Sequence, residues 1–250
     1  RRLGFEPDDL VIANAGGIWQ WTDFENFLLG FVQAYRAGSA SLRLVLSGLK
    51  QSENTDHQEY IDRIGAIFDA NADIVLRKAD IGAAPLQSGA AIVVETDWAA
   101  GTHNLPLMLS AADFGLNVSK DGLENWQSHR VRLLDYAKYD LPVFCTAGDS
   151  FADDWGASSC VQVQRRHPDA YAEALSSIVG RPSETARLRE AARHLRGRLN
   201  SEFDYGRAID VICSSPRRDR SADKESVIDV CRRDFVVATA GKALTLLGAI

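Results

Sequence analysis

The sequence predicts an α/β fold in which a parallel sheet is covered by helices on both faces. Short apolar runs alternate along the chain with longer runs whose apolar residues recur every three or four positions. The short runs lack strict alternation, which is typical of strands buried on both faces. Strands that alternate with helices of this length imply right-handed crossovers and therefore parallel pairing.

The first expected strand, residues 10–15, ends in Gly16-Gly17, and a helix over residues 24–37 follows it. Thr22 or Asp23 is expected to cap this helix. Further elements are then expected in turn: a strand over 42–47, a helix over 57–70, strands over 73–77 and 90–95, and a short helix over 105–112 that begins near Pro106.

The second half continues the pattern, with a strand over 114–118, a helix over 127–139 and strands over 141–146 and 161–164. Helices over 168–179 and 182–199 complete it. We expect one domain over residues 1–213 and a Ser/Pro/Arg/Asp-rich linker over 214–226. Residues 227–250 are expected to form a C-terminal helix or to begin a truncated segment.

Composition narrows the function classes. The 250 residues are 46% hydrophobic, which suffices for a stable core. A net charge of −6 argues against a nucleic-acid partner, which needs a basic surface. The four cysteines show no metal-ligand spacing and suggest a reducing, cytoplasmic compartment with no metal. Because the chain begins with Arg1 and its one methionine is Met108, we expect a piece of a longer protein.

One segment places polar side chains in a loop and a helix between two predicted buried strands. The segment begins at the end of a helix and continues with a buried strand over 114–118, a polar loop, a helix and a second strand. The loop and this helix contain Glu124, Arg130, Arg132 and Asp135. In an open α/β sheet, ligands bind beyond the carboxyl ends of the strands. These polar side chains therefore fall where a ligand would lie.

This segment resembles the donor-binding segment of GT-B glycosyltransferases, in the large retaining family that uses nucleotide sugars. Leu-Leu-Asp-Tyr at 133–136 and Leu-Pro-Val at 141–143 are similar to the family's Leu-Leu-Glu-Ala and Leu-Pro-Val. The family's two acids commonly stand eight positions apart. Glu124 and Asp135 are eleven apart, and Glu124 followed by Arg-x-Arg-x-x-Asp-Tyr matches a subset of the family better.

The resemblance implies roles for these residues. Asp135 would accept hydrogen bonds from both ribose hydroxyls, for which a carboxylate has two oxygens. Glu124 would contact the hydroxyls of the donor sugar. Arg130 or Arg132 would stabilise the departing diphosphate, because a guanidinium fork matches phosphate oxygens and a helix N-terminus favours anions.

Two further features belong to the same resemblance. The loop from Gly16-Gly17 to Asp23 is similar to the Gly-Gly-x-Trp-x-Trp-x-Asp loop of that subset, and glycine lets the backbone approach a ligand closely. It carries no Arg or Lys, although many members of the wider family do. Trp98 follows a strand and would form an aromatic wall for the nucleotide base.

The family implies a Rossmann-like domain that forms the C-terminal, donor-binding half of a GT-B fold, followed by a helical tail. The expected reaction, in polysaccharide biosynthesis, transfers a hexose from a nucleoside diphosphate sugar to a glycan or lipid-linked acceptor, with retention and without a metal or other cofactor. The acceptor site would come from a missing N-terminal domain, so the isolated chain is expected to bind donor and transfer nothing. Peripheral contact with the inner face of a membrane is compatible with this function.

Three alternatives stay open. A non-catalytic scaffold or regulatory domain of the same fold fits the absence of basic residues from the Gly16-Gly17 loop. A nucleotide-sugar epimerase on the same fold would need catalytic acids that the sequence does not place. A flavodoxin-like binding module should have a Ser- or Thr-rich phosphate loop after the first strand, and residues 16–21 do not form one.

Overall fold

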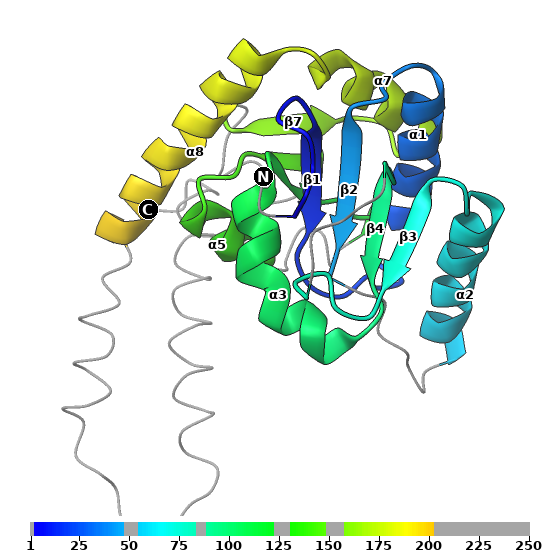
Figure 1. The fold of residues 1–250 in the computed structure, drawn as a ribbon. Coiled ribbons are helices and arrows are strands. Elements are labelled where there is room, and N and C mark those ends of the chain that lie inside the picture. The colour runs from blue at the N-terminus through cyan, green and yellow to red at the C-terminus, as the bar shows by residue number, and fades with distance from the viewer. Residues whose placement is uncertain (1–2, 48–54, 84–88, 123–130, 149–157, 203–250) are drawn as a thin grey trace, which may run out of the picture. The chain divides into compact units, whose positions relative to one another are not determined.

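A seven-stranded, fully parallel sheet forms the centre of the fold, as the sequence predicts (Figure 1). Its strands stand in the order β3-β4-β2-β1-β5-β6-β7. They comprise β1 (Leu10–Asn14), β2 (Leu42–Leu46), β3 (Val75–Lys78), β4 (Ile92–Glu95), β5 (Phe114–Asn117), β6 (Val143–Thr146) and β7 (Cys160–Val163).

The computed structural model describes residues 3–47, 55–83, 89–122, 131–148 and 158–202. These residues belong to one unit of the chain, Arg1–Glu202. The second unit, Phe203–Ile250, lies outside the described residues, and so do the expected linker and the expected C-terminal helix. The division of the chain at residue 213 therefore stays a prediction.

The order of the strands reverses beside β1. From β1 the chain passes to β2, then to β3 at the edge of the sheet, and back to β4 between them, before β5 joins the other side of β1. Ile12 pairs with Leu44 on one side and with Phe114 on the other. In open α/β sheets ligands bind at such a reversal, beyond the carboxyl ends of the strands. The segments that follow β1 and β5 are therefore the first place to look for a site.

Helices cover both faces of the sheet (Figure 1). One face packs against α1 (Phe24–Arg36), α2 (Thr55–Ala70) and α7 (Pro168–Ile178). The other packs against α3 (Trp98–Ala111), α5 (Val131–Lys138) and the later part of α8 (Pro182–Glu202). Within the described ranges, no helix is both long and apolar enough to cross a membrane.

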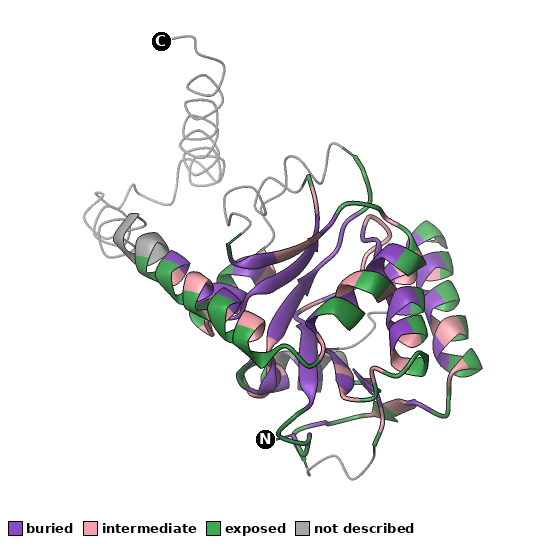
Figure 2. Cartoon of the chain, turned by 90° about the horizontal axis from the view of Figure 1, so that it is seen from above, coloured by how far each residue is buried: buried purple, intermediate pink, exposed green. Residues whose placement is uncertain are grey.

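Two separate hydrophobic clusters correspond to the two faces. In β1, Ile12 packs into the cluster of α1 and α7, whereas Val11 and Ala13 pack into the cluster of α3 and α5. This alternation follows from the pleat of a strand, in which successive side chains point to opposite faces. Both sets are apolar because both faces are covered, which explains the continuous apolar runs in the sequence. Figure 2 shows the buried strands between helices whose outward surfaces are exposed.

One helix begins earlier than the sequence predicts. The expected start near Pro106 is wrong, because α3 begins at Trp98 and contains Pro106 in its interior. Proline lacks an N–H and so removes one hydrogen bond of the helix. The next turn is nevertheless held in place, since Met108 and Leu109 are buried in the core. Packing of this kind stabilises a helix more than local propensity does.

Helix α5 lies in close contact with β5 because β5 contains a glycine. A Cβ added to Gly115 would lie 2.4 Å from two ring atoms of Tyr136, which is fully buried. Only a residue without a side chain allows the ring to approach the strand so closely. The contact between Gly115 and Tyr136 therefore sets the distance between α5 and the sheet.

Replacing this glycine is expected to destabilise the fold. Gly115→Ala should lower the free energy of unfolding by about 1–3 kcal/mol, because overpacking forces the ring or the backbone to move. Gly65→Ala is the matched control, since nothing lies within 4 Å of a Cβ at that helical position. It should leave the free energy of unfolding unchanged or raise it by up to ~1 kcal/mol through helix propensity. Equal urea denaturation midpoints for the two variants would contradict the packing argument.

Candidate functional site

The hydroxyl of Tyr136 joins the ends of the two strands that flank the reversal. It accepts a hydrogen bond from the backbone N–H of Ala15 at 3.1 Å and lies 2.9 Å from the carbonyl oxygen of Leu116 and 3.3 Å from that of Ala13. Burial raises the pKa of Tyr136, so its hydroxyl keeps the proton that it donates to a carbonyl. Helix α5 is thereby attached to both β1 and β5 where these strands end.

Arg132, one turn earlier on α5, contacts the segment that follows β1. Residues 15–23, here named the glycine loop, connect β1 to α1. The guanidinium of Arg132 donates to Asn14 Oδ1 at 2.8 Å and to the carbonyl oxygen of Gly17 at 2.9 Å. An arginine that the sequence places near a ligand is thus in direct contact with the Gly16-Gly17 pair.

The start of the glycine loop is also fixed from β2. Gly16 has a φ of +91°, a conformation that favours glycine. Ser47 Oγ accepts a hydrogen bond from the Gly16 N–H at 2.8 Å and donates to the Gly16 carbonyl at 3.1 Å. The Asn14 side-chain amide donates to the same carbonyl at 3.0 Å. Side chains of β1 and α5, together with Ser47 just after β2, therefore position this backbone turn.

Asp135 is three residues after Arg132, so their side chains lie on the same side of α5. It is half-buried, and burial raises the pKa of its carboxyl group against the opposing charge of Lys138. Among the residues that the structure describes, no hydrogen bond or ion pair holds this carboxylate. A partly desolvated acceptor thus accompanies an arginine on the helix that contacts the glycine loop.

The structure places some of the expected site residues and not others. It brings Arg132 into contact with Gly17, the neighbour of Gly16, and carries Asp135 on the same helix as Arg132. Glu124 and Arg130 lie outside the described residues. Trp98 is the first residue of α3, and its side chain also lies outside the described part. The roles of all these residues stay predictions.

The tryptophans of the glycine loop pack on each other. The rings of Trp19 and Trp21 stack with centroids 5.0 Å apart and planes inclined by 3°. Trp19 also stacks on His57 of α2, at 4.7 Å between centroids. Both tryptophans are half-buried, so the stack supports the loop from the side of α2.

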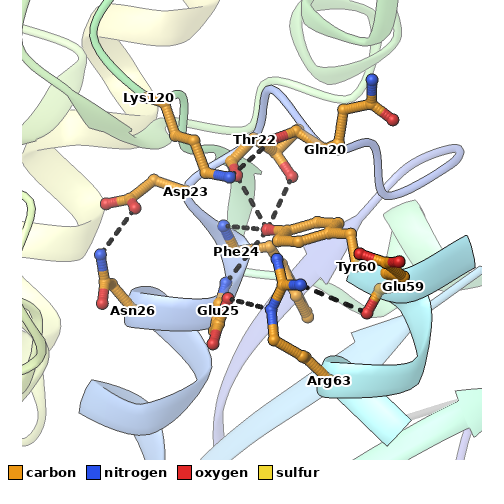
Figure 3. A network of polar contacts seen from close by, with 10 residues as sticks. All are labelled: Gln20, Thr22, Asp23, Phe24, Glu25, Asn26, Glu59, Tyr60, Arg63 and Lys120. Carbon is orange, nitrogen blue, oxygen red and sulfur yellow. Dashed lines mark hydrogen bonds and ion pairs between the residues drawn. The ribbon is translucent and has the colours of Figure 1, made fainter. Parts of the chain in front are cut away.

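A lysine that the sequence did not single out reaches the same loop. Lys120, just after β5, donates from Nζ to the carbonyl of Gln20 at 2.7 Å and lies 4.6 Å from the centroid of the Tyr60 ring (Figure 3). Its backbone N–H donates to the carbonyl of Trp21. The glycine loop lacks its own basic residue, but it has a cation from the segment after β5. The position of Lys120 beside the predicted polar loop could have pointed to this contact. Its partner Gln20, however, lies 100 residues away in the sequence.

Asp23 is the N-cap residue of α1, which begins at Phe24, as the sequence predicts, but its side chain makes no capping hydrogen bond. The carboxylate instead accepts hydrogen bonds from Tyr171 Oη at 2.6 Å and from Asn26 Nδ2 at 2.8 Å. The Tyr60 hydroxyl takes over the cap: it accepts from the N–H groups of Phe24 and Glu25 and donates to the Thr22 carbonyl (Figure 3). These two N–H groups of α1 therefore point at a tyrosine and not at a ligand.

In the part of the chain that the structure describes, His, Cys, Asp and Glu side chains do not gather in groups of three or more that could hold a metal ion.

Stability should depend on pH through Asp23. Burial raises the pKa of its carboxyl group above the ordinary value, and the hydrogen bonds from Tyr171 and Asn26 only partly oppose this. The folded state then binds more protons than the unfolded state between the ordinary and the raised pKa. The free energy of unfolding of the wild type, relative to Asp23→Asn, should therefore fall as the pH rises through that interval.

Asp73→Asn provides a control of opposite sign for urea denaturation measured from pH 3 to pH 7. The hydrogen bond from Arg36 lowers the pKa of Asp73, so the stability it contributes should be lost as the pH falls. Parallel pH profiles for the wild type and Asp23→Asn would contradict the burial argument.

Removing the Tyr136 hydroxyl should destabilise the fold without changing its packing. Tyr136→Phe leaves the buried N–H of Ala15 without its acceptor, which costs about 1–3 kcal/mol. Tyr139→Phe, at the end of the same helix, should change the free energy of unfolding by less than about 0.5 kcal/mol. Thermal denaturation of both variants compares them, and equal midpoints would show that the hydroxyl does not join the strands.

Comparison with known proteins finds solved structures that share this fold. No family model and no curated protein sequence matches this chain. Among solved structures, the C-terminal domain of a glycosyl transferase group 1 family protein, LpcC, from Francisella tularensis is 12% identical, with a TM-score of 0.53. The match covers 74% of this chain and 83% of that domain.

Two longer proteins are similar to the same degree. The α,α-trehalose 6-phosphate synthase of Burkholderia multivorans is 12% identical over 85% of this chain and 45% of its own, with a TM-score of 0.55. Anabaena Alr3699/HepE, solved in complex with UDP and glucose, is 11% identical over 83% of this chain and 49% of its own, also with a TM-score of 0.55. This chain therefore spans about half the length of each. Its described part has the fold of the C-terminal domain of GT-B glycosyltransferases, as the resemblance in the sequence implies.

Proposed function

We propose that this chain binds a nucleoside diphosphate sugar and is the donor-binding half of a glycosyltransferase. One observation carries the proposal: α5 presents Asp135 and Arg132 together and contacts the glycine loop at the reversal between β1 and β5. This is the position in an open α/β sheet where ligands bind. The complex of Alr3699/HepE with UDP and glucose supports the same ligand class.

In this proposal Asp135 recognises the ribose. Its two oxygens can each accept one hydrogen bond from a vicinal diol. Among the described residues no group already occupies them, and burial strengthens a hydrogen bond made there. Trp98 would then lie against the base, and Glu124 would contact the donor sugar, as the resemblance implies.

The diphosphate would lie over the glycine loop. Gly16 and Gly17 have no side chains to prevent its approach. Arg132 brings a positive charge to Gly17, and Lys120 brings a second one to Gln20. Positive groups placed in advance stabilise the charge that develops on the leaving diphosphate as the sugar–phosphate bond breaks. Arg130 would add to them from the start of the same helix.

In the complete reaction, the bond from the anomeric carbon to the diphosphate oxygen breaks and a bond to an acceptor hydroxyl oxygen forms. The proton of the acceptor hydroxyl passes to the departing nucleoside diphosphate or to solvent, and the nucleoside diphosphate leaves. We propose a hexose as the transferred group, retention at the anomeric carbon, and a glycan or lipid-linked acceptor bound by an N-terminal domain. We propose no metal or other cofactor and a cytoplasmic location at the membrane surface.

A non-catalytic scaffold domain is the second candidate. Residues 16–23 contain no Arg or Lys, and the guanidinium of Arg132 is bonded to Asn14 and Gly17. If these contacts only stabilise the fold, the loop would not bind a diphosphate.

Nucleotide binding separates the two candidates. UDP, GDP, ADP and TDP are each added at increasing concentration while thermal unfolding is followed. A nucleotide at 100 times its dissociation constant adds about 2.7 kcal/mol to the free energy of unfolding. This should raise the midpoint by roughly 5–10 °C, at ~2–4 °C per kcal/mol for a chain of this size. Asp135→Ala should abolish the shift, because the ribose loses its acceptor.

Asp62→Ala removes a carboxylate from the exposed side of α2 and should leave the shift unchanged. A shift that survives in Asp135→Ala would contradict the ribose assignment. Absence of a shift with all four nucleotides would overturn the donor-site proposal and favour the scaffold.

A further inference from the structure

We propose that Arg166 is a positioning residue that fixes the segments after β5 and β6 in the geometry the donor site needs. This inference rests on the proposed function, but the loop geometry at its centre can be tested without a nucleotide. Arg166 follows β7 and lies outside the segment in which the sequence placed the site.

The guanidinium of Arg166 contacts three groups on two segments, two through hydrogen bonds and one through an ion pair. Arg166 Nε donates to the carbonyl oxygen of Ser119 at 2.8 Å, and Nη2 donates to that of Ala147 at 2.9 Å. Nη1 lies 2.8 Å from Asp121 Oδ1. Ser119 and Asp121 follow β5, whereas Ala147 follows β6. The fork thus joins the segments after two neighbouring strands, beyond the last paired residues of β5 and β6, Asn117 and Cys145.

The hydrogen bonds to the two carbonyl oxygens contribute most to the position of the Arg166 guanidinium. Ser119 is 1% exposed, and a buried carbonyl without a partner costs free energy. The Arg166 side chain is 16% exposed, so its charge also requires nearby acceptors. Asp121 is 85% exposed, and an ion pair with such a residue contributes little. The backbone oxygens therefore determine where the fork lies.

A short series of contacts leads from Arg166 to the glycine loop. Ser119 is followed by Lys120, whose ammonium and backbone N–H both donate to carbonyls of that loop, at Gln20 and Trp21. Moving Ser119 would thus move the cation proposed to face the diphosphate. On the other side, the carbonyl of Arg166 accepts a hydrogen bond from Asn26 of α1 at 3.3 Å.

Lysine cannot replace the fork. A guanidinium is planar and carries donors on three nitrogens, so it can reach Ser119 and Ala147 at once. An ammonium is a point charge on a flexible stem and can satisfy only one such direction well. Arg166→Lys therefore keeps the charge but removes the bridge, which separates positioning from a long-range electrostatic effect.

The test compares Arg166→Gln, Arg166→Lys and the exposed neighbour Arg165→Gln as control. The first measurement is native-state hydrogen exchange at the N–H groups of Ser119, Lys120 and Ala147, which donate to Thr146 Oγ1 and to the carbonyls of Trp21 and Val163. We expect exchange at least about tenfold faster in both Arg166 variants and unchanged in Arg165→Gln. Exchange at Ala13, inside β1, reports whether the sheet itself stays intact.

The second measurement is the dissociation constant of whichever of UDP, GDP, ADP and TDP the wild type binds. We expect it to rise about tenfold in both Arg166 variants. In Arg166→Ala, 10–20 mM guanidinium chloride should restore a large part of the affinity, which a general loss of stability would not allow.

The outcomes are distinguishable. Unchanged exchange in Arg166→Gln overturns the inference, whether or not a nucleotide binds. Wild-type affinity in Arg166→Lys also overturns it, because charge alone would then suffice. If the wild type binds none of the four nucleotides, the proposed function fails and the link to the donor site falls with it, while exchange alone decides whether Arg166 fixes the two segments. An Arg166→Gln protein that does not fold leaves the decision to Arg166→Lys, measured by the same exchange.

Discussion

The position of α5 against β5 is the constraint on which the candidate site depends. Because Gly115 has no side chain, the Tyr136 ring lies against the strand and its hydroxyl reaches the backbone of both β1 and β5. The same helix carries Arg132 to the glycine loop and presents Asp135 on the same side. A shift of α5 away from the sheet would separate every one of these groups. The packing of Tyr136 on Gly115 therefore also determines the geometry of the candidate site.

The sequence predicts the sheet well and the contacts between loops poorly. Strands buried on both faces leave continuous apolar runs. The rule for ligand positions in α/β sheets directs attention to the segments after β1 and β5, and Arg132 of α5 does contact Gly17 there. The predicted start of α3 is wrong because distant packing decides it. The N-cap residue of α1 is Asp23, as predicted, but the capping hydrogen bonds come from Tyr60. Arg166 could not be recognised at all. Besides the exposed Asp121, its partners are backbone oxygens of other loops, and a backbone oxygen has no signature in a sequence.

Among the residues that the structure describes, positive groups at this edge of the sheet come from three separate segments. Arg132 belongs to α5, Lys120 follows β5 and Arg166 follows β7. All three donate to backbone carbonyls, at Gly17, Gln20 and Ser119 respectively. A loop without basic residues can therefore lie among positive charges that its neighbours supply. The glycine loop has no basic residue of its own, but neighbouring segments place positive charges beside it.

The cap of α1 has a consequence for how the chain folds. A helix capped by its own preceding residue can form its first turn locally. Here the cap is the Tyr60 hydroxyl, which becomes available only after β2 has joined the sheet and α2 has docked. The first turn of α1 should thus form late, together with these more distant elements, and an isolated peptide of residues 20–37 should fray at its N-terminal end. The first turn of α1, which connects β1 to β2, therefore depends on the docking of α2 and should form cooperatively with it.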